Sequence, residues 1–333
     1  MATTLVTGAA GFAGSHLLDL LVRERVGETE TIVGWRRPAA PGGAEGAGRA
    51  GTTGGAGGTG GAGRAGGTEA VRWEAVDVLD RDAVRSAIAR LRPSAVYHCA
   101  GAAHVGRAWE RTGATFAINV RGSHNLLDAL SRADVQCRVL IPSSALVYQP
   151  VDRALREDDP LVPASPYGLS KLAQEMLASH AGPRLDIMVA RAFNHIGPRQ
   201  SPMFAASAFA KRIADIERGR SAPTVPVGNL DARRDLTDVR DTVRAYRLVL
   251  ERAHAGDVFN VCSGVAIPIR ELLDKLIARA RVPVRVEADP ARYRPNDTPE
   301  LVGDAGRIRE RLGWTPGIPI DKTIDDLLEY WRA

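Results

Sequence analysis

The stretch TLVTGAAGFAGSHLLDLL, residues 4–21, decides the fold of this 333-residue chain. A short β-rich run leads into Gly8-Ala9-Ala10-Gly11-Phe12-Ala13-Gly14, and a helical pattern follows. Strand, glycine turn and helix in this order are typical of a dinucleotide site. Gly8 permits the tight turn, Gly11 lets a pyrophosphate approach the helix N-terminus, and Gly14 allows close helix packing. Because the spacing is G-x-x-G-x-x-G, an ordinary glycine-rich loop is the alternative.

The residues after the second predicted strand, 31–35, indicate which dinucleotide is bound. An acidic residue at that strand end binds the ribose diol of NAD, whereas arginine suits the 2′-phosphate of NADP. Arg36 and Arg37 stand there, so we expect NADP(H), with NAD(H) as the alternative. Two solvated arginines in an arginine-rich protein would explain the same pattern.

Strands and helices alternate beyond this point, which predicts an α/β fold with a doubly wound, Rossmann-like parallel sheet. We expect strands at 71–76, 95–99 and 138–142, and helices at 80–91 and 115–130. Ligands bind at the carboxyl ends of such strands. The cofactor candidates at these ends are Asp77, Val78, Ala100, Gly101 and Ala102.

A helical run at residues 165–171 carries the chemistry of the site. Tyr167 and Lys171 are four residues apart, so their side chains share one face of the helix. An ammonium beside a phenol favours phenolate and would lower the pKa of Tyr167. The tyrosine could then exchange a proton with a sugar hydroxyl while a hydride moves elsewhere. A solvated helix face with no catalytic role is the alternative.

Composition excludes several classes of protein. The net charge is +5, but the 44 Lys and Arg are spread among 39 acidic residues without a basic run, so we expect no nucleic-acid partner. Three cysteines without metal spacing indicate a reducing, cytoplasmic location and no metal. Because the glycine motif comes so early and no apolar run is long enough to span a membrane, we expect neither a signal peptide nor a membrane segment. Residues 38–70, rich in Gly and Ala, are expected to form a flexible loop.

Together these motifs resemble the extended short-chain dehydrogenase/reductase superfamily of nucleotide-sugar enzymes. The resemblance implies that Ser144 hydrogen-bonds the reacting oxygen, that Tyr167 is the acid or base, and that Lys171 tunes Tyr167 and holds the nicotinamide ribose. Asn119 matches the position that orders the active-site backbone, and Phe193 also falls at the cofactor. It implies a dinucleotide domain over residues 1–190 and a smaller C-terminal α/β lobe over 191–333, with 235–262 returning to the first domain.

The C-terminal half is most similar to the branch that acts on GDP-sugars. The resemblance rests on the segments 191–198, 209–211, 227–230, 233–241, 260–264 and 294–295. It implies a substrate site made of His104, Ser144, Asn194, Lys211, Val227, Asn229, Arg234, Arg294 and Asp297. A diphosphate needs several cationic donors, and arginine can grip it through two nitrogens. A structural ion pair of Arg234 with Asp235 or Asp238 is the alternative.

Leu146 departs from the pattern of the dehydratases in this branch. They carry a glutamate at this position, which removes the C5 proton. Leucine cannot move a proton, so dehydration is not expected unless another acid substitutes. The resemblance then implies NADPH-dependent reduction of the 4-keto group of a nucleoside-diphosphate 4-keto-6-deoxysugar, GDP-4-keto-6-deoxy-D-mannose being the expected substrate and GDP-6-deoxy-D-mannose the product. A nucleotide-sugar 4-epimerase or dehydratase with tightly bound NAD(P), and a non-catalytic NADP-binding protein, are the alternatives.

Relatives form homodimers through the helices over 115–130 and 166–180, so a homodimer is expected.

Overall fold

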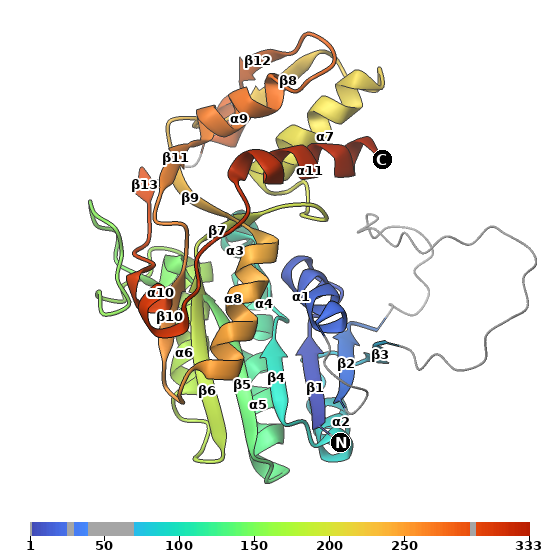
Figure 1. Cartoon of the computed structure of the whole chain (residues 1–333), viewed down its shortest axis with the longest axis vertical. Helices are drawn as coiled ribbons and strands as arrows, with labels where there is room; N and C mark the ends of the chain where they lie inside the picture. The colour runs from blue at the N-terminus through green and yellow to red at the C-terminus, as the bar shows by residue number, and fades with distance from the viewer. Residues whose placement is uncertain (1, 25–29, 39–69, 294–297) are drawn as a thin grey trace, which may run out of the picture.

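A large parallel sheet forms the lower body of the molecule (Figure 1). The computed structural model describes residues 2–24, 30–38, 70–293 and 298–333. Within them, seven strands pair in the order β10-β6-β5-β4-β1-β2-β3, every pair parallel. The strands are β1 (Ala2–Thr7), β2 (Glu30–Arg36), β3 (Arg72–Ala75), β4 (Ala95–His98), β5 (Cys137–Ser144), β6 (Leu185–Ala192) and β10 (Val258–Val261). The predicted Rossmann-like doubly wound sheet is therefore confirmed.

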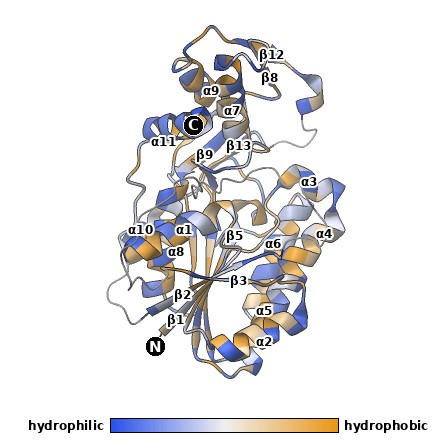
Figure 2. Ribbon diagram, turned by 90° about the vertical axis from the view of Figure 1, so that its right-hand side faces the viewer, coloured by the Kyte–Doolittle hydropathy of each residue, from blue (hydrophilic) through white to orange (hydrophobic). Residues whose placement is uncertain are grey.

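Helices cover both faces of this sheet (Figure 2). One face carries α2 (Arg81–Leu91), α3 (Val105–Glu110), α4 (Thr112–Phe116), α5 (Gly122–Arg132) and α6 (Pro166–Ala178). The other carries α1 (Phe12–Arg23), α8 (Val239–Arg252) and α10 (Gly306–Leu312). Two clusters of buried apolar side chains fill the two interfaces. Covering both faces explains why β4, β5, β6 and β10 are buried along most of their length, whereas the edge strand β3 is largely exposed.

A smaller lobe lies above the carboxyl ends of the strands (Figure 1). It has its own apolar core, to which α7, α9 and α11 contribute. Its elements are β7 (Asn194–Ile196), α7 (Ala205–Glu217), β8 (Thr224–Val227), β9 (Arg233–Asp238), β11 (Ala266–Pro268), α9 (Ile269–Ile277), β12 (Arg285–Ala288), a 3₁₀ turn η3 (Pro290–Arg292), β13 (Glu300–Leu301) and α11 (Ile320–Arg332). The chain enters this lobe after β6 and returns to the large sheet for α8 and β10. It then goes back to the lobe, packs α10 on the large sheet, and ends in the lobe with α11.

Register brings the ends of the central strands to one edge. Thr7 at the end of β1 pairs with His98 of β4, and Ser144 at the end of β5 pairs with Ala192 of β6. The small lobe faces this edge (Figure 1). A ligand between the two bodies would contact strand ends from below and lobe residues from above.

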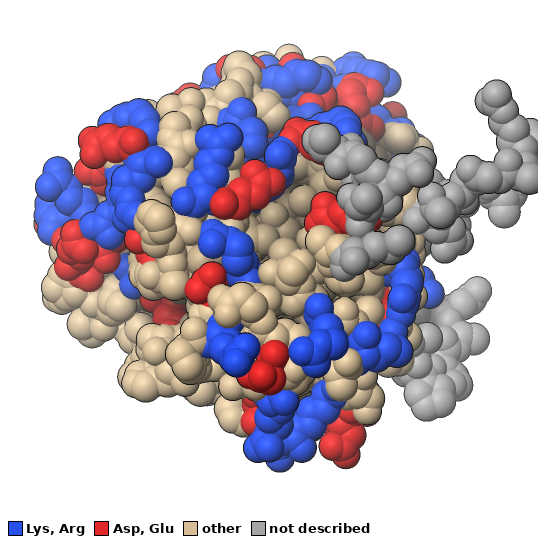
Figure 3. Space-filling model, turned by 60° about the horizontal axis from the view of Figure 1, so that its bottom comes forward, with Lys and Arg blue, Asp and Glu red and all other residues tan. Residues whose placement is uncertain are grey.

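The face drawn in Figure 3 has a mixed charge. Lys and Arg side chains alternate there with acidic and uncharged ones. Many of the described arginines are paired with carboxylates, such as Arg90 with Glu74 and Arg85 with Asp128. No described helix has the length and the apolar sequence that crossing a membrane would require.

Candidate active site

The glycine turn after β1 is shaped for a dinucleotide. Gly8 has φ +63°, and a Cβ there would lie 2.6 Å from the backbone nitrogen of Ala100. A Cβ on Gly14 would lie 2.3 Å from the carbonyl oxygen of Gly8. Gly11 is the N-cap of α1 and provides no side-chain cap, so the N–H groups of the first turn point to where a pyrophosphate would bind. The chain at this turn therefore fits a dinucleotide, as its sequence predicts.

The predicted 2′-phosphate site lies next to this turn. The amide of Ala9 donates to the carbonyl of Trp35, which places the end of β2 beside the turn. The guanidinium of Arg36 lies 5.9 Å from the ring centre of Trp73, and Arg37 donates to Asp77 at 3.2 Å. Both arginines are solvent-exposed. The cofactor candidates after β3 are less open, because Asp77 is half-buried and Val78 is buried.

Asn119 fixes the backbone beyond β4. Its side-chain oxygen accepts from the amide of Ala102 at 2.7 Å, and its side-chain nitrogen donates to Ser170 at 2.9 Å. Asn119 lies in a π-helical turn, η1 (Ala117–Arg121), between α4 and α5. The buried amide thus ties the segment of Ala100, Gly101 and Ala102 to α6. This contact matches the backbone-ordering role that the resemblance implied.

The catalytic candidates converge where β5 meets α6. Ser144 ends β5 and caps the 3₁₀ turn η2 (Ala145–Val147) by accepting from the amide of Leu146. A Cβ on Gly168 would lie 2.1 Å from the carbonyl oxygen of Leu146, so only glycine permits this contact between η2 and α6. The contact sets Tyr167 near Ser144, whose hydroxyl acts to lower the pKa of the phenol.

The sequence-based expectation for the pKa of Tyr167 is wrong. Burial raises its pKa to about 12, while the hydroxyl of Ser144 acts in the opposite direction. Lys171 does not offset the burial, because its ammonium donates to the side-chain oxygen of Gln174 at 2.6 Å. Tyr167 is therefore a neutral phenol near pH 7, and such a group is suited to giving up a proton.

Lys171 is buried, with 8% of its surface exposed. Burial lowers its pKa to about 8, and the nearby Glu175 and Cys99 act to raise it. Near neutral pH the side chain still carries most of its charge. A cation one helical turn from Tyr167 would stabilise negative charge that develops on the phenol oxygen or on a reacting alkoxide.

A cavity of about 480 Å³ opens beside these groups, between the sheet edge and the small lobe. Its walls include Leu146 and Ser165 from the catalytic side and Asn194 and Arg234 from the lobe. The structure thus brings together two of the predicted substrate residues with the residue that replaces the dehydratase glutamate. Among the described residues that line this cavity, none is acidic.

Arg234 is anchored from the lobe side. Its guanidinium donates to the carbonyls of Arg233 and Thr298, both at 2.8 Å. The two aspartates considered as its ion-pair partners have other bonds. Asp235 accepts from Ser263 and Gly264, and Asp238 accepts from Arg240. These contacts hold the Arg234 side chain at the cavity wall.

The other predicted substrate residues do not line this cavity in the described structure. Lys211 pairs with Asp215 of the same helix, and Asn229 accepts from the amide of Asp231. Val227 is buried in the lobe core. His104 caps α3 and bonds to the carbonyl of Met203, which places it near the cavity rim formed by Val105 and Gly106.

The remaining predicted residues lie away from the cavity or outside the described residues. Phe193, predicted at the cofactor, is buried and packs with Cys262 and Leu301 behind the cavity. Arg294 and Asp297 lie outside the described residues. So does nearly all of the glycine-rich segment, residues 39–69.

A buried polar cluster behind the cavity was missed from the sequence. Arg191 of β6 donates to Glu175 at 2.8 Å and to the hydroxyl of Tyr148 at 3.0 Å. Tyr148 in turn donates to Asn260 of β10 at 2.6 Å. Arg191 and Asn260 lie in segments that carry the resemblance, but the sequence does not show that they meet, and only the fold reveals these contacts. Among the described residues, no group of three metal-ligating side chains gathers anywhere.

Comparison with known proteins agrees with this geometry. The model of a family described as GDP-mannose 4,6 dehydratase matches residues 62–327. GDP-6-deoxy-D-mannose reductase of Pseudomonas aeruginosa is 37% identical over 262 residues, which is 77% of this chain and 86% of the relative. UDP-glucose 4-epimerase of Mycolicibacterium smegmatis is 30% identical over 333 residues, covering 99% of this chain and 98% of that enzyme.

Solved structures show the same relationship. The structure of RMD from Pseudomonas aeruginosa complexed with NADPH superposes with a TM-score of 0.79 at 30% identity, covering 100% of this chain and 99% of that one. The Thermus thermophilus UDP-glucose 4-epimerase complex with NAD also has a TM-score of 0.79, at 26% identity and 99% coverage of each chain. Both neighbours contain a nicotinamide dinucleotide.

Proposed function

Because the chain belongs to the GDP-mannose 4,6 dehydratase family, within the NAD(P)-dependent short-chain dehydrogenase/reductase superfamily, we propose that it reduces the 4-keto group of a nucleoside-diphosphate 4-keto-6-deoxysugar. GDP-4-keto-6-deoxy-D-mannose is the proposed substrate, and GDP-6-deoxy-D-mannose is the product. The relative named GDP-6-deoxy-D-mannose reductase and the NADPH complex support this assignment.

One observation favours reduction over dehydration, the reaction for which the family is described. The described wall of the cavity holds Leu146 and no acidic side chain, so it offers no carboxylate to take a C5 proton. Dehydration requires that proton to leave. Reduction requires only a hydride and one proton, and the neutral phenol of Tyr167 can supply the proton.

The residues divide the work as follows. When bound, the nicotinamide cofactor supplies the hydride. Ser144 orients the substrate carbonyl, and Tyr167 gives its proton to the oxygen as negative charge develops there. Lys171 stabilises that charge in a site of low dielectric constant. Asn194 and Arg234 bind the polar part of the nucleotide sugar across the cavity, where arginine can grip a diphosphate oxygen pair.

NADP(H) is the proposed cofactor form. Arg36 and Arg37 support it, since both are exposed cations at the end of β2 beside the glycine turn. We also infer a cytoplasmic homodimer. Cys99, Cys137 and Cys262 are unpaired thiols, which fits a reducing compartment. Leu169 and Met176 are exposed on one face of α6, the helix through which relatives were expected to associate.

A coupled assay tests the function. GDP-4-keto-6-deoxymannose is made in situ, the protein is added, and loss of NADPH absorbance is followed with NADH in parallel. We expect one NADPH oxidised per keto-sugar, and a loss of about 10²- to 10⁴-fold in the Tyr167→Phe variant. Intact keto-sugar and unchanged NADPH would rule out this substrate. Interconversion of UDP- or dTDP-sugars without net NADPH oxidation would instead establish the epimerase.

A further inference from the structure

A chain of hydrogen bonds runs from Lys171 through the interior to the floor of the cofactor site. The ammonium of Lys171 donates to Gln174, and the amide nitrogen of Gln174 donates to the hydroxyl of Ser123 at 2.7 Å. Ser123 lies 2.9 Å from Nε2 of His98, and Nδ1 of His98 lies 2.8 Å from the hydroxyl of Thr7. All five side chains are buried, with exposures between 0% and 8%.

Two donors fix the direction of the bonds in this chain: the ammonium of Lys171 and the hydroxyl of Ser123. An ammonium can only donate, so the Gln174 oxygen accepts and its nitrogen donates to Ser123. The hydroxyl of Ser123 gives its own proton to the carbonyl of Asn119 at 2.6 Å. It therefore accepts from Nε2 of His98, which must carry the ring proton.

The same logic settles the far end of the chain. With its proton on Nε2, His98 accepts at Nδ1 from the hydroxyl of Thr7. That hydroxyl accepts in turn from the amide of Ala100 at 3.2 Å. Thr7 ends β1 directly before Gly8, and Ala100 follows β4. The chain of hydrogen bonds thus links Lys171 to both strand ends that border the dinucleotide turn.

Given the reductase function proposed above, we propose that Gln174 is a positioning residue, held by Ser123, His98 and Thr7 in the one orientation that presents an acceptor to Lys171. A glutamine held less firmly could rotate and present its NH₂ group to the ammonium. The hydrogen-bonded neighbours prevent this rotation. Tyr167, Lys171 and Gln174 are spaced i, i+4 and i+7 and so share one face of α6, and the acceptor reaches the ammonium from the turn after it.

The charges around Lys171 define what substitution of Gln174 would change. Glu175 lies on the same helix, β4 ends with His98 and is followed by the thiol of Cys99, and Tyr167 precedes Lys171 by one turn. Burial and the charge of Lys171 lower the pKa of His98, so its ring stays neutral in the working range of pH. The remaining chain members, Ser123 and Thr7, carry no charge. Removal of the Gln174 acceptor would thus leave the ammonium less stabilised.

The test observes Lys171 directly. The chain has only four lysines, at 171, 211, 275 and 322, so lysine labelled with ¹³C at Cε gives four NMR signals, and the Lys171→Met variant identifies one of them. We expect Gln174→Met to lower the titration midpoint of Lys171 by about half a pH unit or more, and Gln174→Glu to raise it by about one unit. Gln136→Glu, the same change at an exposed position, should leave it unchanged.

Kinetics provide the second readout. In Gln174→Met we expect kcat/KM to fall about tenfold or more, since a hydrogen bond to a charged group is stronger than one between neutral groups. The alkaline limb of the kcat profile should move in the direction of the NMR midpoint in each variant. The NADPH dissociation constant, measured by fluorescence, reports whether the variants keep a folded cofactor site.

Three results would overturn the proposal. They are a Lys171 midpoint that is unchanged in both variants, a shift of the same sign in both, and a ¹⁵N spectrum that places the neutral proton of His98 on Nδ1. None of these NMR results depends on the identity of the sugar. Absence of keto-sugar reduction by the wild-type protein would contradict the proposed function and leave the NMR test of Gln174 in force.

Discussion

At the scale of single residues, Tyr167 shows how burial changes a pKa in the direction opposite to the one that helical spacing predicts. The helical spacing of Tyr167 and Lys171 predicted a phenolate, but burial raises the pKa of Tyr167 to about 12. Spacing reveals which side chains share a face and not how much water they lose. Lys171 is directed to Gln174, which no motif marks. A neutral phenol favours protonation of an alkoxide, in keeping with the reductive direction.

Arg36 is the residue on which we expect coenzyme choice to depend. The Arg36→Ser variant should raise KM for NADPH about tenfold or more and leave KM for NADH nearly unchanged, because only NADPH carries the 2′-phosphate. Initial rates with both coenzymes measure this. Arg72→Ser is the control. Arg72 is exposed, pairs with Glu74, and lies at the end of β3 that is farther from Arg36. Equal losses with NADPH and NADH would contradict a phosphate contact at Arg36.

At the scale of elements, the sequence predicted most of the large sheet because its signals are local. The strand at 31–35 is found at Glu30–Arg36, and the helix at 80–91 at Arg81–Leu91, capped by Asp80. The helix predicted over 115–130 contains a π-helical turn at Ala117–Arg121. That turn accompanies the contacts of Asn119 with Ala102 and Ser170, which lie far away in sequence. Periodicity cannot report such long-range bonds.

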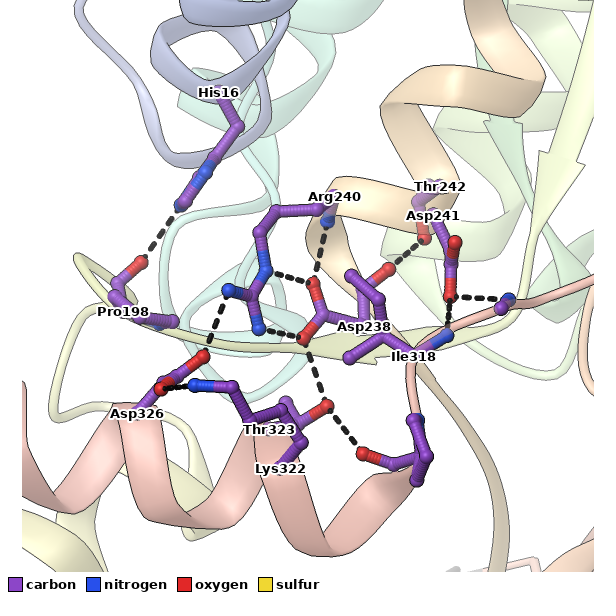
Figure 4. Close-up of polar contacts among 12 residues, drawn as sticks. His16, Pro198, Asp238, Arg240, Asp241, Thr242, Ile318, Lys322, Thr323 and Asp326 are labelled. Atoms are coloured by element: carbon purple, nitrogen blue, oxygen red, sulfur yellow. Dashed lines mark hydrogen bonds and ion pairs between the residues drawn. The ribbon is translucent and has the colours of Figure 1, made fainter.

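His16 makes the attachment of α1 sensitive to acid. Its Nε2 lies 2.9 Å from the carbonyl oxygen of Pro198 (Figure 4), and burial lowers its pKa to about 4. The unfolded chain binds a proton near pH 6.5, whereas the folded one does not until about pH 4. The unfolded state therefore binds more protons within this window, and stability falls as pH falls.

We expect His16 alone to contribute up to about 1.4 kcal/mol per pH unit to this fall, or about 3 kcal/mol in all. Urea unfolding at pH values between 4.5 and 7 measures it. The His16→Asn variant should show a shallower dependence than the wild type. His254→Asn, at an exposed position, should retain the full slope. Identical slopes for His16→Asn and the wild type would exclude a buried neutral His16.

At the scale of the whole molecule, the candidate site is shared between two bodies. The resemblance placed Asn194 and Arg234 at the substrate, and both line the cavity beside Leu146. The motif gave no signal that Val227 is core or that Lys211 pairs within its own helix. Side-chain direction within the lobe depends on how α7, α9 and α11 pack, which a single sequence does not reveal. The association of two protomers and the placement of the small lobe are also properties of the whole molecule.

The proposed dimer makes a prediction about surface substitution. Leu169 and Met176 are 48% and 60% exposed and lie seven residues apart on α6, hence on one face. Light scattering should give a mass about twice 35.6 kDa for the wild type, and the single-chain mass for the Leu169→Glu, Met176→Glu double variant. Val286→Glu, equally apolar to charged but on β12 of the small lobe, should stay dimeric. A monomeric wild type would contradict the proposal.

The placement of the small lobe depends on Asp238, the last residue of β9 and the N-cap of α8, which a buried bond ties to α11 (Figure 4). The hydroxyl of Thr323 donates to Asp238 at 2.7 Å, and Arg240 binds the same carboxylate. Arg240 also pairs with Asp326, one turn further along α11. Thr323 and Asp238 are almost fully buried. Loss of the hydroxyl would leave a carboxylate oxygen of Asp238 short of one partner where water cannot replace it.

Thr323→Val should therefore lower the free energy of unfolding by about 1–3 kcal/mol and raise KM for the nucleotide sugar several-fold. The NADPH dissociation constant should change little, because the glycine turn lies entirely in the large sheet. Thr4→Val is the matched control: it removes a buried hydroxyl bonded to Glu30 within that sheet, and should reduce stability without raising KM for the sugar. Equal KM values for the two variants would mean that the bond stabilises the protein without orienting the lobe, whereas a rise confined to Thr323→Val would show that lobe placement sets the affinity for the substrate.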